Sequence, residues 1–179
     1  EMRAHTTCLM KYLGEGLHGK KRRLLNLNLS DVDLVRYCAT GVKYCFIIIY
    51  GGASSRCCSG EYSTFIINGY VDSCGGGKNS SVTINGDTNS EFGYGVDSCC
   101  LTINGNVRHN AMCYAKNSTF IVNGELEDER DSLYDNKGCT FKTSNKNTLK
   151  KFLEKVTEKG DNKVYFIKSD GTEKLMRTK

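Results

Sequence analysis

The sequence predicts a mainly β chain folded as a single-stranded, right-handed parallel β-helix, with a helix and a hairpin covering its C-terminal end. Three observations indicate this fold: a seven-residue phrase recurs along the chain, apolar and polar residues alternate within it, and most copies close on Asn-Gly. The 179 residues include 19 glycines and no proline, a composition typical of a chain with many tight turns.

The phrase recurs at a nearly constant step. Its clearest copies occupy residues 63–69, 80–86, 99–105 and 118–124, bracketed by weaker copies at 45–51 and 139–145. The copies end 17 to 21 residues apart, the length expected for one coil of a solenoid. A further copy at 25–31 would add a first coil one step of 20 residues earlier.

Aligning the copies gives columns with a period of two, which favours strands over helices. The third and fifth positions are apolar in nearly every copy and should face the core. The first position holds only serine or cysteine, and the second suits the solvent face. The first position holds Cys45, Ser63, Ser80, Cys99, Ser118 and Cys139, and the second holds Phe46, Thr64, Ser81, Cys100, Thr119 and Thr140. The third position holds Ile47, Phe65, Val82, Leu101, Phe120 and Phe141, and the fifth holds Ile49, Ile67, Ile84, Ile103, Val122 and Thr143.

The recurring Asn-Gly pairs have two interpretations. They favour the tight turn of a β-hairpin, which would make an antiparallel meander. In a solenoid, glycine opens a bend and the asparagine amides stack from coil to coil. We favour the solenoid because the segments between the phrases lack a clear partner strand, and because Tyr94, Tyr114 and Tyr134 also recur at steps of 20.

The two ends differ from the repeat. Leu149, Phe152, Leu153 and Val156 predict an amphipathic helix over 147–160, with Asn147 as its N-cap and Gly160 as its C′ residue. Two strand-like runs around Asp170-Gly171 predict a hairpin over 163–178. We therefore expect an N-terminal cap, partly helical and with a candidate first coil, at 1–42, a β-helix core at 43–145, and a C-terminal cap at 146–179.

The run 93–124 resembles the GXGXG family, which includes the C-terminal domain of glutamate synthase and one of the subunits of formylmethanofuran dehydrogenase. The resemblance implies a right-handed β-helix that serves as a structural element beside catalytic domains and has no catalytic residues of its own. It covers residues 43–145. The chain departs from the family where paired glycines would precede each strand, because Ser80-Ser81, Cys99-Cys100 and Ser118-Thr119 stand there.

The ten cysteines contain no Cys-x-x-Cys pair, which argues against a dedicated metal site. We interpret most of them as buried, reduced thiols. Cys45 and Cys99 are three coils apart and too distant to bridge. If any disulfide forms, the pairing that we favour joins Cys57 or Cys58 to Cys74.

Other motifs give weak candidates. His5 with Cys8, and His109 with Cys113, have the spacing of two ligands or of a base and a nucleophile, whereas His18 is isolated. Asn28, Asn79 and Asn117 begin glycosylation sequons, and 75–78 has the composition of a phosphate loop without the following helix. The basic run 20–23 is opposed by five carboxylates within 125–131. We expect surface roles for these residues.

The sequence therefore predicts a non-catalytic scaffold or protein-interaction module, as a structural member of a larger enzyme complex. The alternative is a small cysteine-dependent enzyme or a metal or redox protein that uses the segments between phrases. We expect no catalytic, cofactor-binding or metal-binding residues and no cofactor. The expected partner is a protein or a second copy, without nucleic acid or membrane; no apolar run approaches a membrane span, and we expect a cytoplasmic protein.

Overall fold

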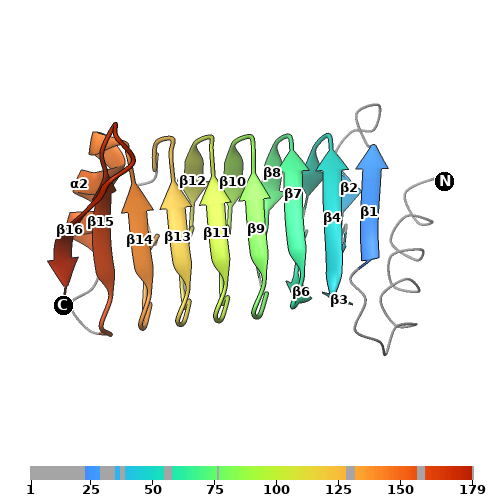
Figure 1. Cartoon of the computed structure of the whole chain (residues 1–179), viewed down its shortest axis with the longest axis horizontal. Coiled ribbons are helices and arrows are strands. Elements are labelled where there is room, and N and C mark those ends of the chain that lie inside the picture. The colour runs from blue at the N-terminus through green and yellow to red at the C-terminus, as the bar shows by residue number, and fades with distance from the viewer. Residues whose placement is uncertain are drawn as a thin grey trace.

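In the computed structural model the repeated phrases form strands that stack side by side, making a parallel β-solenoid of about six turns (Figure 1). The structure describes residues 23–28, 35–36, 39–54, 58–75, 77–127, 132–156 and 160–178. The predicted fold class is therefore confirmed.

One nine-stranded sheet, the main sheet, carries the phrases. Its neighbouring strands run parallel from β1 to β15, and only the last pair, β15 and β16, is antiparallel, so the hairpin-meander alternative is wrong. In spatial order the strands are β1 (Arg23–Asn28), β4 (Cys45–Tyr50), β7 (Thr64–Asn68), β9 (Ser81–Ile84), β11 (Cys100–Ile103), β13 (Thr119–Val122), β14 (Thr140–Thr143), β15 (Lys163–Ile167) and β16 (Glu173–Thr178).

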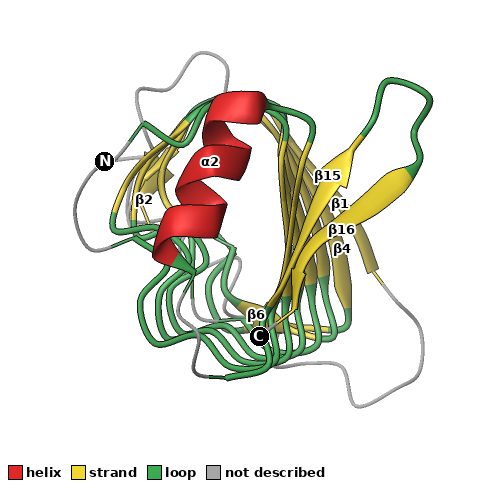
Figure 2. Cartoon of the chain, turned by 90° about the vertical axis from the view of Figure 1, so that its left-hand side faces the viewer, coloured by secondary structure: helices red, strands yellow, loops and turns green. Residues whose placement is uncertain are grey.

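Each coil also contains shorter strands that sequence periodicity did not reveal. A second, five-stranded parallel sheet lies across the core from the main sheet, as the view along the stack shows (Figure 2). A third side begins with one strand pair and continues as single bridges. The second sheet consists of β12 (Val107–His109), β10 (Thr88–Ser90), β8 (Val71–Ser73), β5 (Ala53–Ser54) and β2 (Val35–Arg36), and the third side begins with β3 (Val42–Lys43) and β6 (Gly60–Glu61).

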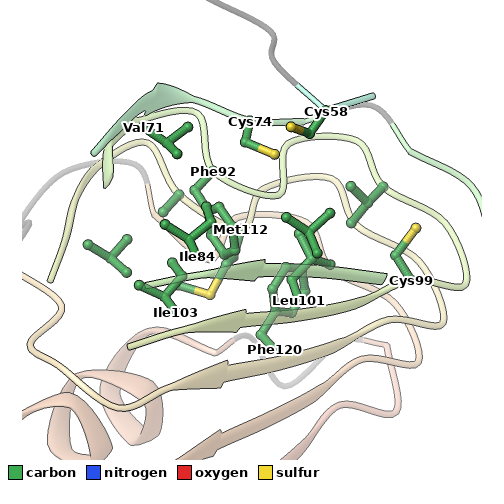
Figure 3. Close-up of a cluster of buried hydrophobic side chains, with 14 of the residues drawn as sticks. Cys58, Val71, Cys74, Ile84, Phe92, Cys99, Leu101, Ile103, Met112 and Phe120 are labelled. Atoms are coloured by element: carbon green, nitrogen blue, oxygen red, sulfur yellow. The ribbon is translucent and has the colours of Figure 1, made fainter. Parts of the chain in front are cut away.

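The core lies between these sides, and the predicted columns fill it. Every residue of the third and fifth phrase positions is buried, and the small first-position residues are buried beside them. Figure 3 shows side chains of the main sheet, such as Leu101 and Phe120, pointing into the same space as Val71 and Phe92. Phe120 stacks on Phe141 with ring centroids 5.4 Å apart. Burial of these columns supplies the main favourable free energy of folding.

The asparagine column forms the predicted amide ladder. The side-chain Nδ2 of Asn85 donates to Oδ1 of Asn68, and the same bond joins Asn104 to Asn85 and Asn123 to Asn104, each at 2.7 Å. The glycine that follows each asparagine lies directly on the glycine of the coil before, so that a Cβ at Gly105 would fall 2.5 Å from the carbonyl carbon of Gly86. Glycine is thus required by close backbone approach.

The first coil is present but in a different register from the predicted one. The alignment of 25–31 placed Leu25 beside Cys45, whereas Leu25 pairs with Ile47 and Leu27 with Ile49. The shift is two residues, so both leucines keep the inward parity of the strand. Hydrophobic alternation fixes the face of a strand but leaves even shifts open, and the sequence signal could not separate them.

The structure contains the predicted C-terminal helix, but the helix begins and ends at other residues than predicted. Helix α2 (Lys146–Lys155) has Asn145, not Asn147, as N-cap, because Oδ1 of Asn145 accepts from the backbone N of Asn147 at 2.8 Å and of Thr148 at 3.1 Å. The helix ends at Lys155, and Gly160 lies beyond it.

Helix α2 lies across the end of the coil stack (Figure 2). Phe152 is fully buried, and its ring lies 5.5 Å from that of Phe141. The hairpin β15–β16 extends the main sheet beyond β14, with a register shift at Val164 and Tyr165. These elements cover the last coil as predicted.

Candidate functional site

The outward face of the main sheet changes character along its length. In the first coils it carries the apolar patch, which consists of Leu24, Phe46, Ile48, Tyr50 and Ile66. At the positions that pair with Ile66 in the next coils the chain has Thr83 and then Thr102. Leu24 is 66% exposed and Tyr50 46% exposed. Since β9 and β11 hold serine, threonine or cysteine at the positions equivalent to Phe46 and Ile48, a coil can form without these large apolar side chains.

The same face is free of charge from β4 to β13. Its outward positions are apolar residues, hydroxyl residues, asparagines and Cys100, and the first charged side chain is Lys142 on β14. In the whole sequence 25% of residues are charged. A depletion of charge on one exposed face is characteristic of the centre of protein interfaces.

A groove of about 500 Å³ runs along the corner between this face and the third side, across four coils. One wall belongs to the outward face and the other to the corner itself, and small residues form the floor. The lining residues are, for the outward wall, Thr64, Ser81, Cys100 and Thr119; for the corner wall, Tyr62, Asn79, Ser98 and Asn117; and for the floor, Ser63, Ser80 and Cys99.

The floor is held by an internal ladder of small side chains. The hydroxyl of Ser63 accepts from the backbone N of Cys45, the hydroxyl of Ser80 accepts from that of Ser63, and each bond is 3.1 Å long. Ser80 also donates to the carbonyl of Lys78 at 2.9 Å. Serine and cysteine can replace each other here because both fit a crowded corner and donate to the backbone carbonyl two residues earlier. The thiol of Cys99, for example, donates to the carbonyl of Asp97 at 3.3 Å.

A column of charged residues lies on the other side of the corner wall. Lys43 pairs with Glu61 at 2.9 Å, and Lys78 pairs with Asp97 at 3.8 Å. The hydrogen bond from Ser98, with Oγ 2.9 Å from the carboxylate, is the main cause that lowers the pKa of Asp97. The charges beside the groove therefore alternate in sign from Lys43 to Asp97, and the column continues with Lys116 and Lys137.

The cysteines show the predicted burial. Of the seven cysteines in the described part of the chain all are free thiols, and every one except Cys100 is buried. Cys58 and Cys74 both lie in the core without a disulfide, so the structure does not contain the pairing that we favoured for Cys58 (Figure 3). Cys57 lies outside the described residues. Burial raises the pKa of the Cys99 and Cys139 thiols, which lowers their thiolate fraction at neutral pH.

We expect Cys100 to be alkylated at least about tenfold faster than Cys99 or Cys139 at pH 7, because the thiolate must be both formed and accessible. Brief treatment with iodoacetamide followed by peptide mass spectrometry measures each site separately. In the Cys100→Ser variant the fast modification of this peptide should disappear. Equal labelling of Cys99 and Cys100 in the native protein would show that the corner opens readily.

The histidine candidates gain no support as a site. His109 is exposed at the end of β12, whereas Cys113 is 3% exposed and its Sγ donates to the carbonyl of Ala111 at 3.4 Å. A buried thiol of this kind is a poor nucleophile. His5, Cys8 and His18 lie outside the described residues.

Residues of the other motifs either form ion pairs or lie exposed at the surface. Lys78, at the end of the glycine-rich segment, belongs to the charged column, and a strand rather than a helix follows it. Glu127 of the acidic run pairs with Arg108 at 3.0 Å. Asn79 and Asn117 of the sequons are exposed in the groove wall, while Asn28 ends β1.

Two features are absent from the described residues. They contain no group of three or more His, Cys, Asp or Glu side chains arranged to hold a metal ion. Nor do they form any helix with the length and apolar character needed to cross a membrane. Comparison with known protein families, with curated proteins and with solved structures gives no match.

Sequence reasoning missed both the apolar patch and the groove. The patch had a visible signal, since the outward second, fourth and sixth positions of the phrase change from Phe46, Ile48 and Tyr50 to Ser81, Thr83 and Asn85. The corner wall of the groove had none, because Tyr62, Asn79 and Ser98 share a backbone conformation rather than a side-chain type.

Proposed function

We propose that this chain is a non-catalytic β-solenoid scaffold that binds a protein partner through the apolar patch on β1, β4 and β7. The observation that carries the proposal is the gathering of apolar outward residues at one end of this face. Ile48 and Ile66 lie side by side on neighbouring strands, whereas the next two coils have Thr83 and Thr102 at the same position. Ile121, at this position one coil further on, has only Thr119 and Asn123 beside it on the outward face of its strand. Apolar side chains that are exposed or partly exposed on an uncharged face indicate a surface that another protein covers.

Two further features support a scaffold over a thiol-dependent enzyme. The described cysteines other than Cys100 are buried, and burial holds the pKa of Cys99 and Cys139 above the ordinary value. The hydrogen-bonded ladders run from coil to coil and give a rigid rod, which suits positioning another protein. The resemblance of 93–124 to the GXGXG family implies the same structural role.

The test compares a double variant with a matched control. Ile48→Thr with Ile66→Thr places in the patch the residue that the fold itself uses at Thr83, so folding should be kept. Ile121→Thr makes the same change on the same face but four coils from Ile48. We expect the double variant to bind its partner about tenfold or more weakly, because it loses two isoleucine side chains that the partner would cover.

A photoreactive phenylalanine analogue in place of Tyr50, introduced in the source cells, identifies the partner by the protein cross-linked to this position. The same partner should co-purify in fixed ratio with the wild type and with Ile121→Thr, and be lost with the double variant, while circular dichroism stays unchanged. Retention of the partner by the double variant, or absence of a stoichiometric partner, contradicts the proposal.

A further inference from the structure

The groove at the corner is lined by side-chain groups that the fold leaves available for hydrogen bonding. The hydroxyls of Thr64, Ser81 and Thr119 and the amide of Asn79 have no hydrogen-bond partner among the residues that the structure describes. At the opposite end of the same strands the asparagine amides from Asn68 to Asn123 bond to each other. The groove therefore presents donors and acceptors that a ligand can use.

An aromatic ring closes the N-terminal end of the groove at a conformational cost. The corner residues adopt left-handed backbone conformations, with φ of 53° at Tyr62, 51° at Asn79 and 49° at Asn117. Asparagine tolerates this region, whereas a bulky residue there is unusual and strained. Tyr62 is 46% exposed, and its ring stacks on that of Tyr44 with centroids 5.2 Å apart. Tyr44 thus covers one face of the Tyr62 ring, which remains partly open where it lines the groove.

The charges near the groove exclude a strongly ionic ligand as the best match. Lys78 and Asp97 form an ion pair beside the corner wall, as do Lys43 and Glu61, and the wall itself is uncharged. A polyanion such as single-stranded nucleic acid needs a continuous basic track, and the carboxylates of Glu61 and Asp97 interrupt this column beside the groove. A neutral ligand that both donates and accepts hydrogen bonds fits the lining.

The repeat of the groove indicates a chain rather than a compact ligand. Equivalent side chains recur once per coil, at the strand spacing of about 4.8 Å. Alternate side chains of an extended peptide recur at about 6.7 Å and do not match this step. The backbone groups that a peptide strand would need are already used, since the N–H of Ser81 donates to Ser63 at 2.9 Å and that of Cys100 to Ser80 at 2.9 Å. The length of one pyranose unit along a linear oligosaccharide is close to this spacing between coils, so successive sugar units can lie on successive coils.

We propose that this groove binds a neutral, linear oligosaccharide, one sugar unit per coil. The sugar hydroxyls bond to Ser81, Thr119 and the amide of Asn79, and the apolar C–H face of the first ring lies on the Tyr62 ring. Two hydroxyl contacts and one ring contact are each modest, so binding is weak per unit and grows with chain length.

The experiment titrates the full ¹⁵N-labelled chain with linear hexasaccharides of β-1,4-linked glucose, mannose, xylose and N-acetylglucosamine, and with hexagalacturonate as the charged probe. We expect a neutral hexasaccharide to shift the backbone amide signals of Asn79, Ser98 and Asn117 first. A trisaccharide of the same sugar should bind more weakly. No shift with any neutral sugar, or tighter binding of hexagalacturonate than of all four, overturns the proposal.

Variants that respect the fold separate binding from stability. Tyr62→Asn introduces at this corner position the residue type that the next coil already has there, at Asn79. The double variant Ser81→Ala with Thr119→Val removes two hydroxyls of the groove. Each should weaken the best neutral hexasaccharide by about tenfold or more. The control, Thr83→Val with Thr102→Val, removes hydroxyls of the same face outside the groove and should bind like the wild type. Equal affinity of all variants, or an equal loss in the control, overturns the proposal.

Discussion

Replacing Gly105 by alanine is expected to lower the free energy of unfolding by about 3 kcal/mol, with a melting temperature about 10 °C lower. The added Cβ would fall 2.5 Å from the carbonyl carbon of Gly86 and would also overlap Oδ1 of Asp87. Neither neighbour can withdraw easily, because Asp87 accepts a bond from the backbone N of Asn106 at 2.8 Å and the amide ladder fixes Asn85 to Asn104. The stacked coils must separate.

Gly77→Ala is the matched control. A Cβ at Gly77 meets no atom closer than 3.4 Å, so the backbone need not move and the stability should change by less than about 1 kcal/mol. Thermal melts followed by circular dichroism measure both variants. A Gly105→Ala protein that melts with the wild type would show that the coils can part without loss of the ladder.

Replacing Phe120 by alanine is expected to cost about 3 to 5 kcal/mol, because the change leaves a large cavity in the core. The Phe120 ring is fully buried, stacks on Phe141 at 5.4 Å and meets Phe92 edge-on at 6.5 Å. It also packs against Gly93, where an added Cβ would fall 3.3 Å from the Phe120 Cζ. Chemical denaturation with circular dichroism gives the change.

Phe46→Ala removes the same side chain from the outward face and serves as the control. Phe46 is only partly buried, so we expect a loss of about 1 kcal/mol or less. If the two variants lost nearly the same free energy of unfolding, burial of the Phe120 ring would contribute little to stability. Because a solenoid can unfold coil by coil, a broadened transition is expected in Phe120→Ala rather than a simple shift.

Much of the fold follows from the sequence because one coil constrains the next. Phe65, Val82 and Leu101 share a column and pair with one another across neighbouring parallel strands. Such a column shows which face of each strand points inward and which strand lies next to it. The asparagine ladder was predictable for the same reason, since identical amides at one step satisfy each other.

Elements without a repeated side chain were less predictable. The three-residue strand Val71–Ser73 is too short to show a period, and it was missed. Asn145 and Asn147 are both suitable N-caps by residue type, and only the observed backbone shows that Asn145 accepts the two bonds. The groove depends on backbone dihedral angles at Tyr62 and Asn79, which side-chain patterns do not record.

The direction of the last strand affects whether a second molecule can extend the stack of coils at this end. A parallel stack ends in an open strand edge, and such an edge invites the first coil of another molecule to continue the stack into a filament. Here β16 runs opposite to all the strands before it, and its pairing with β15 is interrupted at Val164 and Tyr165. A coil arriving at this edge finds neither the direction nor the register that a parallel stack offers. The C-terminal hairpin therefore opposes end-to-end stacking of further molecules on this end.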